Sequence, residues 1–294
     1  MKINASDILQ VIAGGLAVGS VYALVALGFT IISNALHLIN FAQGDMYMLG
    51  AVFGYTFFVG FHMPYFIALI AATLVVALVG VCIERTIFRP LRNSPQLNMV
   101  IATVGISITI RAVAQNIWGS QAMAFPEVFG STPVKIGPIA IMPDYFWILG
   151  IALAAIVLLQ LFFKKTLTGR AMQATAQNRN AASMMGINVF KSDSLAAAIS
   201  AGLGAIGGVL VGPIFFVETT MGAMAALKGF AAAVLGGFGS VPGAIVGGVV
   251  LGLAENLSAT FISSTYRDAV AFVILVVVLI FRPNGILGKR ALRA

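Results

Sequence analysis

Long runs of apolar residues, separated by short polar linkers, make up most of the chain. A helix that crosses a lipid bilayer needs about 20 apolar residues. Five runs reach or approach this length. They are Ile8–Ile32, Tyr65–Ile83, Leu97–Ile117, Tyr145–Phe163 and Ser194–Val217. The first run exceeds the core of a cleaved signal peptide, which has about 7–15 apolar residues, so we expect it to be retained as a span.

Three further apolar segments are less regular. Gly44–Gly60 is short, and Ala269–Phe281 needs the preceding Ser264–Asp268 to reach across a bilayer of ordinary thickness. Gly229–Leu257 is long and rich in glycine, and Pro242 interrupts it. A proline in a helix removes a backbone hydrogen bond and breaks or bends the helix. This segment therefore predicts either a pair of broken helices or a re-entrant hairpin.

The composition agrees with a protein that is covered by lipid. Hydrophobic residues make up 60% of the 294 residues and charged residues only 9%, whereas soluble domains carry about 25% charged residues. So few charges cannot cover a folded surface with polar groups. We predict an all-α, polytopic transmembrane helical bundle with about eight spans, some of them broken or re-entrant. It forms a single membrane domain over residues 1–294, with a cytoplasmic segment at residues 164–193.

The distribution of basic residues predicts how the chain is oriented. The net charge is +8, and the Lys and Arg residues concentrate in the linkers after Ile83 and Phe163 and in the tail. Basic loops stay on the cytoplasmic side, so we place these regions and the C-terminus inside and Trp118–Asp144 outside. The N-terminus then lies outside, and Glu218–Leu257 crosses twice or not at all. Because the charges lie between apolar runs, we expect lipid rather than nucleic acid as their partner.

Two glycine-rich interruptions occur at membrane depth, one in each half of the chain. The first spans His37–Gly50 and the second Lys228–Gly243. Paired interruptions in corresponding halves indicate a transport path, although small residues also permit tight packing between helices. We leave both interpretations open. The candidate path residues are Asn40, Gln43, Asp45, Gly236, Gly237, Gly239 and Pro242.

Charged residues at or near the ends of apolar runs bear on the same question. A charge at the centre of a bilayer costs about 2.5–3.5 kcal/mol, so such residues face a cavity, face a partner or reach the headgroups. We expect Arg111, Glu218 and Lys228 to reach the headgroups. For Asp45 and Glu255 the sequence leaves the headgroups and a cavity equally open.

The linker of residues 164–193 predicts a docking element. Residues from Arg170 to Met185 have good helix propensity and an apolar stripe at helical spacing. Such a helix could lie on the membrane surface or fit a groove on a partner. Its low charge and its methionines favour a protein partner.

Three stretches resemble the branched-chain amino acid permease family of bacterial ABC transporters, in its shorter type of subunit. They are Gly14–Gly28, Leu38–Asp45 and Ala231–Gly248, and the likeness covers nearly the whole chain. Asn180–Gly186 also has the spacing of the cytoplasmic Glu-Ala-Ala-x-x-x-Gly motif of ABC importer permeases. Here Asn180 replaces the Glu, and the later Leu-Pro of the motif is absent.

The resemblance implies a subunit that forms the translocation path for Leu, Ile and Val across the inner membrane. Its partners would be a second permease subunit, two ATP-binding subunits and a periplasmic or extracellular substrate-binding protein. Contact with the ATPases would fall on Arg170, Ala174, Arg179, Asn180, Ala181, Ala182 and Gly186.

The energy source is expected in other chains. This chain has no Gly-x-x-x-x-Gly-Lys-Ser/Thr phosphate loop, so ATP and Mg²⁺ would bind to the partner subunits, and we expect neither enzyme activity nor a cofactor here. His37 and His62 are far from other ligand types, so we expect no metal site.

Other functions remain open at this stage. The same type of complex could import urea, amides or small organic acids. A secondary transporter or channel working alone would show inverted repeats and more intramembrane acids for ion coupling. A scaffold subunit without a transport role is a further alternative.

Overall fold

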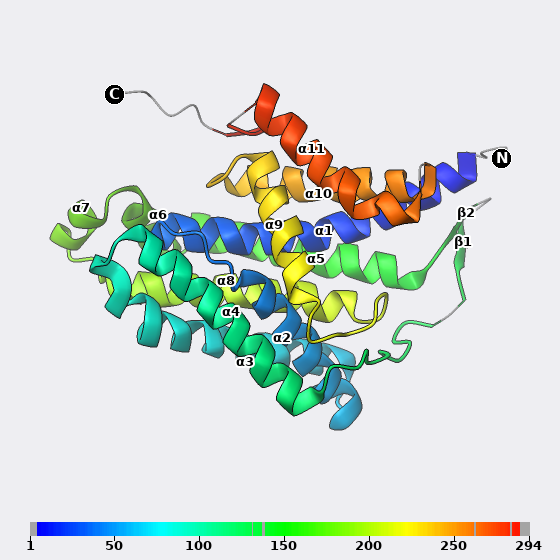
Figure 1. Cartoon of the computed structure of the whole chain (residues 1–294), viewed down its shortest axis with the longest axis horizontal. Helices are drawn as coiled ribbons and strands as arrows, with labels where there is room; N and C mark the ends of the chain where they lie inside the picture. The colour runs from blue at the N-terminus through cyan, green and yellow to red at the C-terminus, as the bar shows by residue number, and fades with distance from the viewer. Residues whose placement is uncertain (1–4, 131, 137–138, 262, 283, 289–294) are drawn as a thin grey trace.

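A bundle of helices lies along the long axis of the molecule (Figure 1). The computed structural model describes residues 5–130, 132–136, 139–261, 263–282 and 284–288. Within these residues seven helical segments are long and apolar enough to cross a membrane. They comprise α1 (Ala5–Leu36), α3 (Tyr65–Ile83), α4 (Gln96–Trp118), α5 (Pro143–Lys165), α8 (Val189–Val211), α10 (Val241–Phe261) and α11 (Arg267–Phe281). The predicted all-α, polytopic bundle is confirmed.

Shorter elements connect or interrupt these helices. The short helices are α2 (Gln43–Tyr55), α6 (Leu167–Gln177), α7 (Arg179–Met184) and α9 (Gly222–Gly236). Two π-helical turns, Thr56–Gly60 and Glu84–Phe88, extend α2 and α3, and two 3₁₀ turns occupy Pro90–Asn93 and Ser264–Tyr266. In the linker after α4, β1 (Val134–Ile136) pairs antiparallel with β2 (Ile139–Ile141).

Several helix ends follow from local sequence. Helix α3 begins at Tyr65, directly after Pro64, and ends at Ile83, as predicted. The predicted span Ser194–Val217 is displaced, because α8 begins at Val189 and ends at Val211. The Asn188 side chain accepts a hydrogen bond from the Lys191 N–H and caps the start of α8. Pro213, two residues after Val211, cannot continue the helix.

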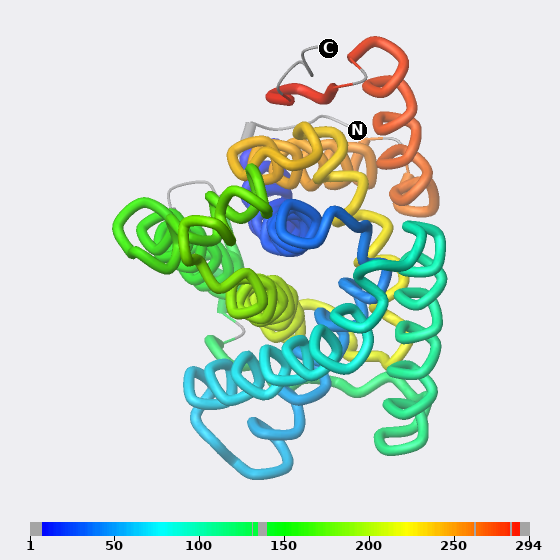
Figure 2. The backbone as a smooth tube through the Cα atoms, turned by 90° about the vertical axis from the view of Figure 1, so that its left-hand side faces the viewer, coloured from blue at the N-terminus to red at the C-terminus, as the bar shows by residue number. Residues whose placement is uncertain are grey.

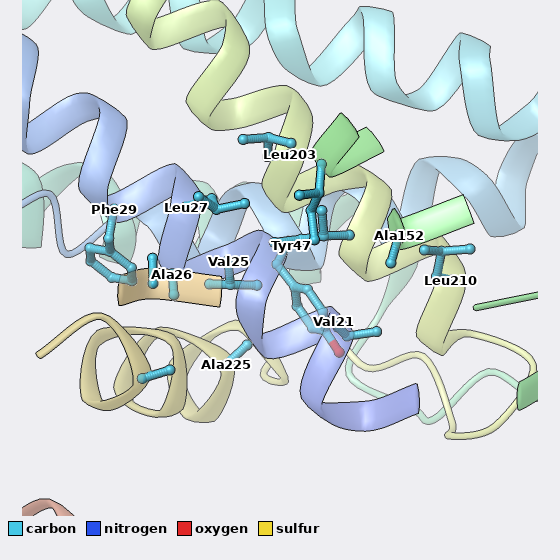
Figure 3. Packing of buried hydrophobic residues seen from close by; sticks show 14 of the residues in the cluster. Val21, Val25, Ala26, Leu27, Phe29, Tyr47, Ala152, Leu203, Leu210 and Ala225 are labelled. Carbon is cyan, nitrogen blue, oxygen red and sulfur yellow. The ribbon is translucent and has the colours of Figure 1, made fainter. Parts of the chain in front are cut away.

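Helix α1 lies in the centre of the bundle, and most of its apolar stretch is buried inside the protein. Close contacts with α10 depend on glycine, because a Cβ on Gly19 or Gly252 would meet the backbone of the facing helix. Figure 3 shows part of this core, where Tyr47 of α2 and Leu203 of α8 lie beside side chains of α1 such as Val21 and Leu27. The outer helices α3, α4, α5 and α11 instead expose many large apolar side chains, which lipid would cover.

The two ends of the bundle differ. Helices α6 and α7 lie at one end, and the β1–β2 hairpin lies at the other end, beside the start of α1 (Figure 1). This separation fits the predicted orientation, in which the linker 164–193 is cytoplasmic and Trp118–Asp144 is external. Lys289, Arg290 and Arg293, part of the basic tail, lie outside the described residues.

Candidate functional site

Two half-helices meet inside the bundle. After α1 the chain turns back through residues 37–42, and α2 begins part-way along the bundle (Figure 1). After α8, residues 212–221 also lead to a point within the bundle, where α9 begins. The starts of α2 and α9 touch, because a Cβ on Gly222 would lie 2.8 Å from the carbonyl oxygen of Gly44.

The half-helices leave this point in opposite directions. Helix α2 runs alongside α8, and Gly54 near its end packs on Val209 near the end of α8. Helix α9 runs alongside α1, where Phe230 packs edge to face against Phe29 at 5.9 Å between ring centroids. Figure 2, seen along the bundle, shows α9 between α1 and the outer helices α4 and α11. Each half of the chain therefore contributes one half-helix, and the two are inverted.

A buried carboxylate lies where the half-helices meet. Helix N-termini carry unpaired N–H groups and partial positive charge. Asp45, in the first turn of α2, is fully buried, and its Oδ1 accepts a hydrogen bond from Arg111 Nε of α4 at 2.7 Å. Arg111 Nη2 also donates to Ser107 Oγ at 2.7 Å. The expectation that Arg111 reaches the headgroups is therefore wrong, because its guanidinium pairs with the buried Asp45.

Asn40 and Gln43 lie beside Asp45 and are also buried. Asn40 Oδ1 accepts from the Ala42 N–H at 3.1 Å and stabilises the turn into α2. Gln43 Nε2 donates to the Ser200 carbonyl oxygen of α8 at 2.9 Å. The structure therefore brings Asn40, Gln43 and Asp45 together at the start of α2.

The other candidate path residues form the turn between α9 and α10. Gly237 and Gly239 have φ values of 114° and 87°, which only glycine adopts easily. The Gly239 carbonyl oxygen accepts a hydrogen bond from Asn34 Nδ2, near the end of α1, at 2.9 Å. Gly236 packs on the backbone of α10, and Pro242 lies exposed in its first turn. The structure places these four residues apart from Asn40, Gln43 and Asp45.

The segment Glu218–Leu257 holds α9 and most of α10, and the expectation that it crosses twice or not at all stays a prediction. Helices α9 and α10 are antiparallel, and Gly247 of α10 packs on Ala232 and Gly236 of α9. The break lies at residues 237–240 rather than at Pro242, because a proline fits the first turn of a helix.

The linker between α5 and α8 forms two helices, α6 and α7, rather than the single predicted helix from Arg170 to Met185. Asn178 has extended dihedral angles, φ −151° and ψ 106°, and its Oδ1 caps α7 by accepting from the Ala181 N–H at 3.0 Å. An asparagine that competes for backbone groups favours such a cap over a continuous helix. Met184 and Met185, at the end of α7, are 88% and 83% exposed.

The predicted coupling residues all lie on this linker. Arg170, Asn180, Ala181 and Gly186 are exposed, Ala174 and Arg179 are partly buried, and Ala182 is buried. Arg179 Nη1 donates to the Ala35 carbonyl oxygen of α1 at 2.9 Å, and Arg179 Nη2 forms an ion pair with Asp193 of α8. Helix α7 is therefore attached to both α1 and α8.

A second buried charge cluster joins α9, α10 and α11. Glu255 is fully buried, and its Oε1 lies 2.5 Å from Lys228 Nζ and 2.8 Å from Arg267 Nε. Asp268 Oδ1 lies 2.7 Å from Lys228 Nζ. Lys228 is only 8% exposed, so the expectation that it reaches the headgroups is wrong. This pair was not predicted from the sequence. The signal that could have indicated it is a lysine in one apolar segment, Gly222–Gly236, and a glutamate in the next, Val241–Phe261. Glu218 is exposed.

No metal centre is found among the residues described here, since no three His, Cys, Asp or Glu side chains group together. The expectation that the chain has no metal site stays a prediction.

Known proteins are similar to this chain in sequence or in fold. The chain is 36% identical to the high-affinity branched-chain amino acid transport system permease protein LivH of Salmonella typhimurium, over 96% of both chains. It is 35% identical to the corresponding protein BraD of Pseudomonas aeruginosa, again over 96% of both chains. Among solved structures, PsaBC from Streptococcus pneumoniae, in complex with Fab, has a similar fold. Its TM-score is 0.51 at 15% identity, over 94% of this chain and 92% of that chain.

A family model gives the same result. The model of the permease component of the branched-chain amino acid transport system matches residues 11–279. This range includes both half-helices and the linker with α6 and α7. The chain therefore belongs to the family of permease components of branched-chain amino acid transport systems.

Proposed function

We propose that this chain forms the translocation path for leucine, isoleucine and valine across the bacterial inner membrane, as the permease subunit of an ABC importer. One observation carries the assignment of a translocation path: two inverted half-helices meet at Gly44 and Gly222 within the bundle. Broken helices of this kind surround the substrate path in transporters, because their ends offer polar backbone groups at membrane depth. Asn40, Gln43 and Asp45 supply polar side chains at the same level.

The energy comes from partner chains. The complex consists of this subunit, a second permease subunit, two ATP-binding subunits and a substrate-binding protein outside. ATP and Mg²⁺ bind to the ATPases, so this chain is a transport subunit and not an enzyme. The exposed Met184 and Met185 offer an apolar surface for an ATPase groove. A hollow of about 880 Å³ also opens between the end of α3, α6 and the start of α8.

Arg179 transmits the movement. When the ATPases close on ATP, they displace α6 and α7. Because Arg179 ties α7 to Ala35 of α1 and Asp193 of α8, both helices move with it. These two helices carry the contacts of Gln43 with Gly28 and Ser200. A rigid-body motion at the cytoplasmic end, where the C-terminus also lies, thereby reaches the junction of the half-helices.

A secondary transporter working alone is the main competing function. Inverted half-helices occur in that class too, so they do not separate the two functions. Ion coupling requires acids at membrane depth that can exchange protons or bind cations. Asp45 and Glu255 instead pair with Arg111, Lys228 and Arg267. This pairing favours a subunit driven by partner ATPases.

The test is uptake in cells that lack their own branched-chain amino acid transport. Cells receive the complete partner set with or without this chain, and uptake of radiolabelled leucine is measured. We expect uptake only with this chain, competition by isoleucine and valine, and co-purification of an ATPase. Competition by urea or short amides, without competition by isoleucine and valine, would show that the same type of complex carries another substrate. Uptake that persists without any ATPase would contradict the proposal.

A further inference from the structure

A cavity of about 330 Å³ opens next to the junction of the half-helices. It lies between α1, α2, the first two turns of α9, the start of α11 and the segment that leads from α8 into α9. Small-molecule sites occupy about 300–1,000 Å³ and combine apolar walls with a few polar groups. This cavity therefore has the size for a small ligand.

The walls are apolar and flexible. Phe215 and Phe216 of the connecting segment and Met221 and Met224 at the start of α9 line the cavity. Aromatic and methionine side chains pack well against branched aliphatic groups, because methionine adapts its shape to irregular surfaces. The walls therefore suit the side chain of leucine, isoleucine or valine.

Two cationic side chains line one side of the cavity, and buried or neighbouring carboxylates accompany them. Arg267 and Lys228 line it, and both lie close to Oε1 of the buried Glu255. The three donors of the Lys228 ammonium face Glu255, Asp268 and the Tyr22 hydroxyl. Within the described residues, the terminal nitrogens of Arg267 make no hydrogen bond, and its guanidinium lies 5.6 Å from the Phe215 ring centroid. A guanidinium fork binds a carboxylate with two parallel hydrogen bonds.

A negative charge also lines the cavity. Glu218 lies in the connecting segment, and among the described side chains its carboxylate meets only the Thr220 hydroxyl, at 3.3 Å. A carboxylate accepts hydrogen bonds from an ammonium group. An α-amino acid carries a carboxylate, an ammonium group and a side chain on one carbon, and the cavity presents one partner for each.

From this arrangement we infer that the cavity is a binding site for a zwitterionic α-amino acid with a branched apolar side chain. Arg267 binds the carboxylate, Glu218 binds the ammonium group, and Met221, Met224 and Phe215 contact the side chain. The inference rests on the proposed transport function, which it deepens by naming the groups that recognise the substrate. It also gives a role to the Lys228–Glu255 pair, which holds Arg267 in place through Glu255.

The test is cysteine protection in the full-length chain in lipid nanodiscs. The native Cys82 is replaced by Ser, and Met224→Cys supplies the only thiol. We expect leucine to slow maleimide labelling of this thiol. 4-Methylpentanoate, which lacks the ammonium group, and 3-methylbutylamine, which lacks the carboxylate, should protect far less. Gln121→Cys, exposed after α4 at the same end of the bundle, serves as the control. It should label at the same rate with and without each of the three compounds.

Variants of the two charged partners complete the test. Glu218 is exposed, so Glu218→Gln should fold normally and weaken leucine protection about tenfold, the loss of one charge-assisted hydrogen bond. Arg267→Lys keeps the positive charge beside Glu255 but lacks the fork, and should weaken protection by a similar factor. Unchanged protection in both variants, or equal protection by the amine, would overturn the assignment.

The uptake assay separates this inference from the proposed function. If leucine does not protect Met224→Cys while the complex still takes up leucine, the cavity assignment is wrong and the transport function stands. If the complex takes up no branched-chain amino acid, the proposed transport function is wrong, whatever the labelling of Met224→Cys shows.

Discussion

Gly44 and Gly222 come from opposite halves of the chain, yet their backbones touch where α2 and α9 begin. A Cβ on Gly44 would lie 2.7 Å from the Ala226 backbone nitrogen, and one on Gly222 would lie 2.8 Å from the Gly44 carbonyl oxygen. Such distances leave no room for a side chain. The junction of the half-helices therefore depends on glycine at both positions.

Replacing Gly44 with alanine should destabilise the protein. The added methyl must push α9 away, and overpacking of this kind costs about 1–3 kcal/mol. We expect a lower melting temperature of the purified chain in detergent and reduced uptake. Gly105→Ala in α4 is the matched control, because nothing lies within 4 Å of its Cβ position. The glycine contact would lose its assigned role if both variants melted at the same temperature.

Removing Arg111 should be more damaging. Arg111→Met leaves the buried Asp45 charged and without its ion-pair partner. Breaking a fully buried pair costs about 3–5 kcal/mol, and because the Arg111 side chain is 32% exposed we expect a loss near the lower end of this range. Asp45→Asn in the same chain removes the unpaired charge, so the double variant should regain much of the lost stability. Melting temperatures of the wild type, both single variants and the double variant give the coupling. Additive losses in the double variant would show that the two residues act independently.

Much of the fold could be predicted from the sequence, because each membrane span is recognisable from a local run of apolar residues. Tyr65–Ile83 coincides with α3, and Ala269–Phe281 with Ser264–Asp268 forms the last span. Both spans need only a run of apolar residues at the right length. The break between α6 and α7 was not predicted. Helix propensity is good throughout this linker, and the sequence alone does not show that Asn178 caps α7.

The candidate site was predicted only in part. Asn40, Gln43 and Asp45 stand within a few residues of one another, so a local pattern sufficed to group them. Their partners Arg111 and Ser200 lie on other helices, and a single sequence does not say which helices touch. These partners can be identified only when the packing of the helices is known.

Access to the path should change with the nucleotide on the ATPases. In the complex with Cys82→Ser, we expect Asn40→Cys to react with a water-soluble maleimide at rates that differ between the ATP-bound and nucleotide-free states. Asn40 is 6% exposed in this conformation, so a high rate requires opening. Constant labelling at this position would count against the proposed path.

The exposed methionines of α7 should be required for assembly. Met184→Asp with Met185→Asp places two charges on the surface that we assign to the ATPase contact. Because both side chains are almost fully exposed, the isolated chain should keep its melting temperature. We expect the ATPase to be lost on affinity purification of the complex. Gln173→Asp, exposed on the neighbouring α6, controls for added charge, and equal retention of the ATPase in all variants would refute the contact.

Arg179 should transmit force without being needed for folding. Asp193 has two cationic partners, Arg179 and, at 3.5 Å, Arg92. In Arg179→Ala the carboxylate of Asp193 keeps Arg92, so the bundle should remain folded, but α7 loses its attachment to α1 and α8. The ATPases would then still bind and hydrolyse ATP.

Loss of coupling is the specific result expected for Arg179→Ala. In proteoliposomes, leucine uptake per ATP hydrolysed should fall severalfold, and loaded binding protein should no longer stimulate hydrolysis. Arg92→Ala is the matched control, because it removes the other partner of Asp193 and leaves α7 attached. An equal fall in both variants would mean that the charge of Asp193, rather than the attachment of α7, controls transport.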